Sequence, residues 1–273
     1  MITSLKNPRV KLVRALQTNR RARARERLYV VEGRRLLEEV DRTAVAPLTV
    51  LHHDHLGERD RGVVNRLARR GATIEVVSDE VLAACSATET ASGLLAVLPF
   101  QNLSPPPEPS LVLICDRIGD PGNMGAVLRT AEAAGVDMVL AAPGSVDIYN
   151  PKVVRGGAGA HLRLPVLPLD WNAIRAAVVH CECLLASSHS GVPYDAVDWT
   201  RRSALIVSSE TGGSGEQARA LAHADVHIPM ASATESLNVA VAAGVLLMEA
   251  ARQRRGAATA PHRLTSSGGE SHA

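Results

Sequence analysis

The stretch "DRIGDPGNMGAVLRTAEAAG", Asp116–Gly135, decides the fold of this chain. The apolar run "LVLIC" precedes it, and a second, "MVLAAP", follows it. Runs that are apolar on both faces predict buried strands, so the segment between them is expected to be a loop that opens into a helix. Proline and glycine account for the sharp turn. They do not account for Asn123 and Arg129, which are therefore candidate functional residues.

The same alternation of apolar strands and amphipathic helices continues to the end of the chain. Helices are expected over 122–134, near 150–158, and from Ser236 onward. Strands that are apolar on both faces and separated by helices predict a parallel sheet covered on both sides. The second half of the chain is therefore expected to be an α/β domain.

A smaller α/β pattern fills the first hundred residues, where Asn7 and Pro8 predict the N-cap and first residue of a helix. The proline-rich stretch "QNLSPPPEPS" predicts a stiff linker. The polar tail after Arg255 has the composition of a disordered segment. The expected divisions are residues 1–100, a linker at 101–110, a domain at 111–255 and a disordered tail at 256–273.

The net charge of +2 hides a strong asymmetry. Residues 1–35 carry eleven Lys or Arg and two Glu, whereas the rest carries nineteen basic and twenty-six acidic residues. A basic arm on an acidic body predicts a polyanionic partner such as a nucleic acid. The run "NRRARARER" could be a solvated helix face, but the charge surplus favours contact with RNA. The candidate RNA-binding residues are Arg20, Arg21, Arg23, Arg25, Arg27 and Arg34.

Several other functional classes are disfavoured. Aromatic residues make up only 2% of the chain, which argues against a base-stacking surface for single strands. The four cysteines show no C-x-x-C spacing, and the histidines of "HHDH" have no partner ligands at a useful spacing, so no metal site is expected. With no signal peptide and no apolar run long enough to span a bilayer, we expect no membrane partner and a cytoplasmic location.

Three strand ends carry most of the polar chemistry, and ligands of open parallel sheets bind at the carboxyl ends of strands. The first is the opening stretch. The second, "LIVSSETGGSGEQA", places Glu210 and a glycine-rich turn after a strand, and the third, "IPMASATESLNVAVA", places Ser236 and Asn238 before a helix. Read singly, Asn123, Ser236 and Asn238 could be helix caps, and Glu210 a solvated turn residue.

The second loop also contains a G-x-G-x-x-A match, Gly213–Ala218. This spacing is formally that of a dinucleotide-binding loop. However, it lies late in the domain, and the next strand, "VHIPM", ends without the expected acidic residue. A nicotinamide or flavin enzyme is therefore disfavoured.

Taken together, the three loops resemble the SpoU (TrmH) family of RNA ribose 2′-O-methyltransferases, of the SPOUT class. The segments that carry the resemblance are "DPGNMGAVLRTAEAAG", "SSETGG" and "IPMASATESLNVAVAAG". The segment "RARERLYVVEGRRLLEEV" resembles the family's substrate-binding domain, which is similar to ribosomal protein L30e. The resemblance implies an L30e-like N-terminal domain, a SPOUT domain with a deep trefoil knot, and a homodimer.

The resemblance also implies S-adenosylmethionine as cofactor, held mainly by backbone groups. The residues implied around it are Ser208, Ser209, Gly212, Ile228, Met230 and Leu237. The implied catalytic residues are Arg129, Asn123, Glu210, Ser236 and Asn238. Because an arginine side chain stays protonated, we expect Arg129 to position the RNA and stabilise developing negative charge rather than act as a base.

The expected function is transfer of a methyl group to a ribose 2′-hydroxyl of structured RNA. The segments "SSETGG" and "SATESLN" resemble most the thiopeptide-resistance branch, which modifies large-subunit ribosomal RNA, so 23S ribosomal RNA is the expected substrate. The alternatives are a tRNA ribose 2′-O-methyltransferase and a non-catalytic RNA-binding protein that retains the fold.

Overall fold

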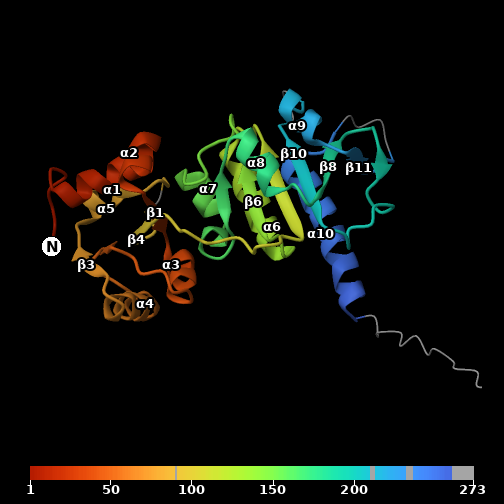
Figure 1. Cartoon of the computed structure of the whole chain (residues 1–273). Helices are drawn as coiled ribbons and strands as arrows, with labels where there is room; N and C mark the ends of the chain where they lie inside the picture. The colour runs from red at the N-terminus through yellow and green to blue at the C-terminus, as the bar shows by residue number, and fades with distance from the viewer. Residues whose placement is uncertain (90, 210–212, 232–235, 260–273) are drawn as a thin grey trace, which may run out of the picture.

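The computed structural model of the chain describes residues 1–89, 91–209, 213–231 and 236–259, and these form a four-stranded and a seven-stranded β-sheet (Figure 1). The α/β class predicted from the sequence is confirmed. None of the helices within the described residues combines the length and the hydropathy that crossing a bilayer requires.

The first sheet has the strand order β1-β4-β2-β3, with β4 antiparallel to both of its neighbours and β2 parallel to β3. The elements of this part are α1 (Pro8–Thr18), α2 (Arg20–Glu26), β1 (Leu28–Glu32), α3 (Arg34–Asp41), β2 (Thr49–His52), α4 (Glu58–Arg69), β3 (Thr73–Val76), α5 (Asp79–Cys85) and β4 (Leu94–Pro99). Helices α1 and α5 cover one face, and α3 and α4 cover the other. The predicted start of α1 is confirmed, because the Asn7 side chain accepts from the Arg9 N–H and Pro8 is the first helical residue.

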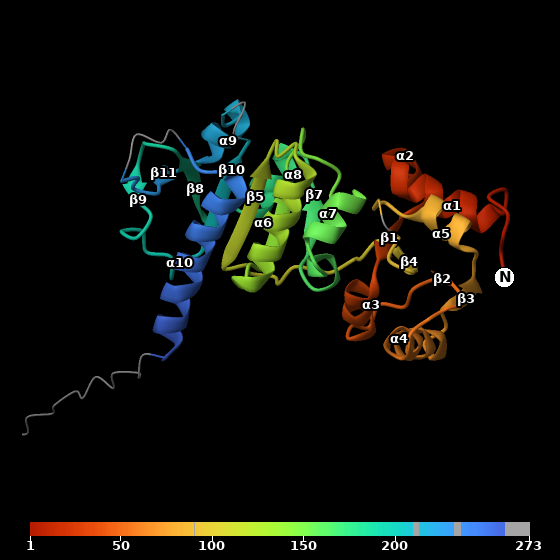
Figure 2. The same cartoon turned by 180° about the vertical axis from the view of Figure 1, so that it is seen from behind.

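The second sheet has the strand order β7-β6-β5-β10-β8-β11-β9, and every pairing in it is parallel, as predicted. Its elements are β5 (Leu111–Asp116), α6 (Pro121–Ala133), β6 (Met138–Ala141), α7 (Pro151–Gly156), the 3₁₀ helix η1 (Ala160–Leu162), β7 (Val166–Pro168), α8 (Trp171–Ala177), β8 (Glu182–Ser187), β9 (Val192–Pro193), β10 (Ser203–Ser208), α9 (Glu216–Leu221), β11 (Ala224–His227) and α10 (Val239–Thr259). Figure 2 shows α6 and α10 side by side on one face of this sheet, while α8 and α9 cover the other.

Two boundaries differ from the expectation. The last helix begins at Val239 rather than Ser236, because Asn238 caps it. It also continues through Thr259, so residues 256–259 are helical, and the remainder of the expected tail lies outside the described residues. The trefoil knot remains a prediction, since 210–212 and 232–235, in two of the motif loops, are also outside the described residues.

The two sheets share one hydrophobic core, in which Tyr29 of β1 packs near Tyr149 and Leu162 of the second half. Phe100 stacks on Tyr149 with ring centroids 3.7 Å apart. A largely buried ion pair joins the same two parts, because Arg23 of α2 lies 2.7 Å from the Asp147 carboxylate. Packed rings and a largely buried ion pair resist sliding, so the two halves are held in one arrangement.

A close helix contact sets the position of α7. A side-chain carbon added at Gly125 of α6 would lie 2.9 Å from the Gly156 Cα and 3.0 Å from the Val153 carbonyl oxygen. The backbones of α6 and α7 therefore touch where neither helix carries a side chain. This contact explains the glycine in the middle of the opening stretch.

We predict opposite effects of alanine at two helical glycines. Gly125→Ala should lower the free energy of unfolding by about 1–3 kcal/mol, because the added methyl group has no room. Gly244→Ala in α10 is the matched control, because its added carbon would meet only the Thr130 Cγ2, at 3.7 Å. The control should be neutral or stabilising by up to about 1 kcal/mol. Urea unfolding measures both, and equal effects would contradict the tight contact.

Candidate functional site

The turn after β5 is built by Asp120, not by Asn123. The Asp120 carboxylate accepts a hydrogen bond from the Asn123 N–H at 2.7 Å, and Pro121 is the first residue of α6. Aspartate before proline is a strong helix start, since the carboxylate satisfies an orphan N–H and proline lacks one. The reading of Asn123 as the helix cap is therefore wrong, and its side chain is available for other contacts.

Asn123 and Asn238, from two separate loops, meet through their side chains. The Asn238 amide nitrogen donates to the Asn123 Oδ1 at 3.0 Å. The Asn238 Oδ1 accepts from the Ala240 N–H, also at 3.0 Å, and so caps α10. Because backbone N–H groups can only donate, the orientation of the Asn238 amide is fixed, and through it that of Asn123. The Asn123 NH₂ group is left directed away from Asn238, as a donor for a ligand.

Arg129 lies on the solvent side of α6. The opposite side of the helix is buried in the core through Met124, Val127 and Leu128. The Arg129 side chain is exposed and has no ion-pair or hydrogen-bond partner among the residues the structure describes. An exposed, uncompensated guanidinium suits a phosphate group, which it can bind through two parallel hydrogen bonds.

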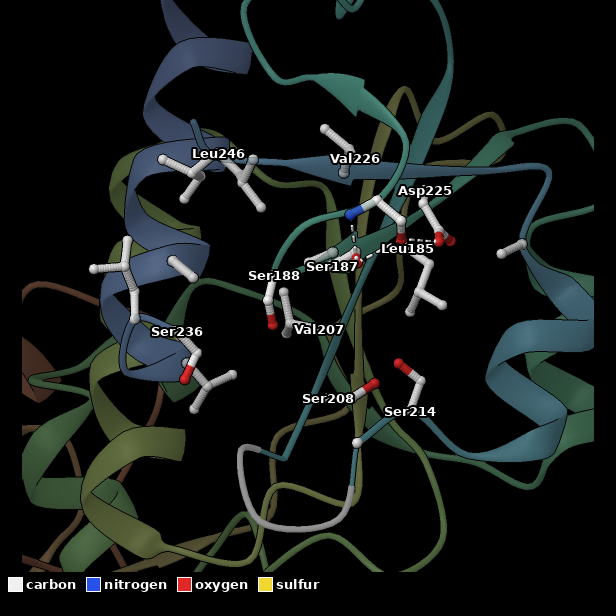
Figure 3. Close-up of a pocket in the computed structure, with 18 of the residues that line it drawn as sticks. Leu185, Ser187, Ser188, Val207, Ser208, Ser214, Asp225, Val226, Ser236 and Leu246 are labelled. Atoms are coloured by element: carbon white, nitrogen blue, oxygen red, sulfur yellow. Dashed lines mark hydrogen bonds between the residues drawn. The ribbon is translucent and has the colours of Figure 1, made fainter. Parts of the chain in front are cut away.

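A cavity of about 720 Å³ opens at the carboxyl ends of β8, β10 and β11 and is bordered by α10 (Figure 3). Its lining includes five of the six residues expected around a cofactor, together with one expected catalytic residue. These residues are Ser208, Ser209, Ile228, Met230, Leu237 and Ser236. The sixth, Gly212, and the expected catalytic residue Glu210 lie outside the described residues.

The cavity wall combines apolar and hydroxyl-bearing side chains. Figure 3 shows Val207, Val226 and Leu246 around it, with Ser208 and Ser214 facing each other across its lower part. The volume is ordinary for a small-ligand site, and apolar walls with a few convergent polar groups are typical of such sites. This lining fits a ligand that joins a planar base with apolar faces to a sugar and a short polar chain, as S-adenosylmethionine does.

Asp225 is a carboxylate of the cavity wall that the sequence patterns did not single out. Its Oδ2 accepts from the Ser190 hydroxyl at 2.6 Å, and the Ser190 N–H donates to the Ser187 Oγ. The turn that carries Ser190 passes close to β11, because a side-chain carbon added at Gly191 would lie 1.9 Å from the Asp225 carbonyl oxygen. Only glycine fits there, and its φ of +92° is also one that glycine favours.

Asp116, the last residue of β5, ties the second loop to the first. Its buried carboxylate accepts from the Ser208 hydroxyl at 3.1 Å and from the Gly215 N–H at 2.8 Å. Next to it, Arg117 donates to the Gly213 carbonyl oxygen at 2.6 Å. Both flanks of the glycine-rich loop are therefore anchored on the end of β5. An acidic residue at the end of a fully apolar strand was the sequence signal for this role.

The six arginines expected to bind RNA do not share one environment. Arg20 and Arg21 are exposed on α2, and their side chains have no partner within the described part of the chain. Arg25 pairs with Glu26 on the surface. Arg27 donates to Asn102 and lies over the Phe100 ring.

The other two of the six are engaged within the protein. Arg34 pairs with Glu38 and Asp60 at the surface. Arg23 is only 3% exposed, and it donates to the Asp147 carboxylate and to the Leu16 carbonyl oxygen. Because its donors face the protein interior, Arg23 is a structural residue in this arrangement and does not reach a phosphate.

Comparison with known proteins agrees with the geometry. Residues 110–248 match the model of the SpoU rRNA Methylase family, and residues 7–96 match an MRM3-like substrate binding domain. An uncharacterized tRNA/rRNA methyltransferase of Synechocystis is 35% identical over 94% of this chain and 96% of its own length. The 23S rRNA guanosine 2′-O-methyltransferase RlmP of Bacillus subtilis is 31% identical over 90% of this chain and 97% of its own.

Solved structures are also similar over both sheets. The AdoMet-bound rRNA methyltransferase from Sinorhizobium meliloti superposes with a TM-score of 0.80 at 26% identity. The superposition covers 92% of this chain and 97% of that one.

We predict that the capping function of the Asn238 side chain can be measured by substitution. Asn238→Ala should lower the free energy of unfolding by about 0.5–2 kcal/mol, because α10 loses its cap. Asn238→Asp keeps an acceptor at that position, and its negative charge suits a helix N-terminus, so its stability should stay near that of the wild type. Urea unfolding compares the two, and an equal loss in both would show that Asn238 does not act as a cap.

Proposed function

The chain belongs to the SpoU rRNA methylase family, and we propose that it transfers a methyl group from S-adenosylmethionine to a ribose 2′-hydroxyl of 23S ribosomal RNA. The observation that carries the proposal is the cavity, because it gathers the described residues implied for the cofactor at one sheet edge. The Asn123–Asn238 hydrogen bond then joins the first and third motifs of the family beside the same sheet edge.

The cofactor, when bound, supplies an electrophilic methyl group. The residues of this chain have the remaining tasks, which are to orient the ribose, hold the adjacent phosphate and exclude competing geometries. The Asn123 NH₂ group is set by Asn238 to donate to a ribose oxygen. Arg129 is protonated, so it serves as a phosphate ligand and stabilises negative charge that develops on the 2′-oxygen.

We propose that the N-terminal part of the chain binds the RNA substrate. Two observations support this: the match of residues 7–96 to a substrate binding domain, and the exposed side chains of Arg20 and Arg21, which pair with none of the described residues. Arg23 contributes indirectly, because it fixes α2 against the second half of the chain.

The direct test uses the purified chain, S-adenosylmethionine with a labelled methyl group, and separate pools of unmodified ribosomal RNA and tRNA. Label in the ribosomal RNA, with one phosphodiester bond made resistant to alkali, is the expected result, because a 2′-O-methyl group blocks alkaline cleavage. Label in the tRNA pool alone would show that the substrate is tRNA and not ribosomal RNA. Cofactor binding without transfer to either RNA would favour a non-catalytic RNA-binding protein.

We predict that Arg129→Ala lowers kcat by about 10²–10³-fold, the range for loss of one charge-stabilising group. Its dissociation constant for S-adenosylmethionine should be unchanged, because Arg129 does not line the cavity. Arg129→Lys keeps the charge but loses the planar fork, so its kcat should be intermediate. Single-turnover kinetics and calorimetry measure the two effects, and wild-type kcat in Arg129→Ala would remove Arg129 from the active site.

We also propose that the enzyme is a homodimer that pairs through α10. One side of this helix packs into the core, whereas Val241 and Met248 on another side are 52% and 43% exposed, with Val245 half-buried between them. Apolar residues at i, i+4 and i+7 form one stripe, and such a stripe in water is the usual sign of a partner surface. A second copy is the proposed partner.

Sedimentation tests the dimer. The double variant Val241→Glu/Met248→Glu should sediment as a monomer at a concentration where the wild type is dimeric, because four charges would be brought into the interface. Val179→Glu is the matched control, since Val179 is 69% exposed after α8 and should leave the dimer intact. A monomeric wild type, or a double variant that still dimerises, would contradict the proposal.

A further inference from the structure

Helix α7 is wedged between the two halves of the protein. It packs against α6 on one side and against β1 on the other. Its adjacent residues Val153 and Val154 are both buried, the first in the core beneath the seven-stranded sheet and the second in the core shared with the four-stranded sheet. The helix is thus immobilised by two cores, and only part of its surface faces water.

The solvent face of α7 carries two positive charges. Lys152 and Arg155 are exposed and lie three residues apart, which places them on the same side of the helix. Neither has an ion-pair or hydrogen-bond partner for its side chain among the described residues. Arg163, just beyond α7, shows the contrast, since it pairs with both Glu39 and Glu132.

The position of α7 connects the basic helix α2 with the active site. On one side, Arg23 of α2 is bonded to Asp147, and the Asp147 carbonyl oxygen accepts from the N–H of Asn150, the residue that caps α7. On the other side, α7 touches α6 at Gly125, one helical turn before Arg129. Helix α7 therefore lies between α2 and the part of α6 that carries Arg129.

We propose that Lys152 and Arg155 bind phosphates of the RNA substrate and bridge the basic residues of α2 to Arg129. The inference rests on the proposed function and deepens it, because it names a phosphate-binding surface outside the three family motifs. A structured RNA would contact α2, α7 and α6 in succession, with its backbone crossing the junction of the two sheets. Exposed cations that pair with none of the described residues lower the cost of binding a polyanion, since no salt bridge to those residues has to be broken first.

The test is the salt dependence of RNA binding by the full chain. Lys152→Gln/Arg155→Gln should reduce the slope of log affinity against log salt by about 1.5–2, as expected for two lost phosphate contacts. The control is Arg59→Gln/Arg69→Gln, which removes the same charge from exposed, unpaired positions on α4. Figure 1 and Figure 2 both place α4 on the side of the N-terminal part opposite α2, so the control slope should match the wild type.

Two further readouts separate this inference from the proposed function. The probe is an unmodified ribosomal RNA transcript, and the α7 variant should raise KM for it with little change in kcat. Calorimetric affinity for S-adenosylmethionine should be unchanged, because neither residue lines the cavity. If the wild type methylates RNA but the salt slope of the α7 variant equals that of the control, phosphate binding by Lys152 and Arg155 is contradicted. The proposed function is then unaffected. A wild type that neither binds nor methylates RNA would overturn both.

Discussion

The parallel pairing of β5 with β10 is the constraint on which the site depends. Their register runs from Leu111 opposite Ser203 to Asp116 opposite Ser208, so both strands end at one edge of the sheet. The loops that follow must then emerge side by side. The Asp116 carboxylate uses this proximity to hold Ser208 and Gly215, and the Asn123–Asn238 hydrogen bond adds the third loop. The relative positions of the three loops therefore follow from the order of the strands more than from any single side chain.

The sequence was sufficient to predict the α/β class and the parallel sheet, because apolar runs are local signals. The family motifs were sufficient to name five residues that line one cavity, whereas their contacts with a cofactor stay a prediction. The environment of Arg23 could not be predicted, since its partner Asp147 lies 124 residues away and both stand in ordinary polar segments. The choice of Asp120 over Asn123 as the helix cap was readable in principle, because aspartate directly before Pro121 is the stronger start signal. The role of Asp225 depends on a turn whose path no local pattern describes.

The few aromatic residues are used for structure. The chain has one phenylalanine and three tyrosines. Of these, Phe100, Tyr29 and Tyr149 form a cluster at the junction of the two sheets, with Tyr29 completely buried. The stacked rings lie where the two halves of the chain could otherwise slide past each other.

A rigid junction of this kind fixes the distance between α2 and the active site. The span from α2 to Arg129 is set by packed rings, a largely buried ion pair and the Gly125–Gly156 contact, so an RNA bound as we propose would have to match that span. If α2 and α7 bind phosphates as we propose, the distance and angle of a nucleotide from those phosphates would help to select the nucleotide that is modified. Retargeting such an enzyme to another position would require changing the residues between its two sheets, even if every residue around the cofactor were left as it is.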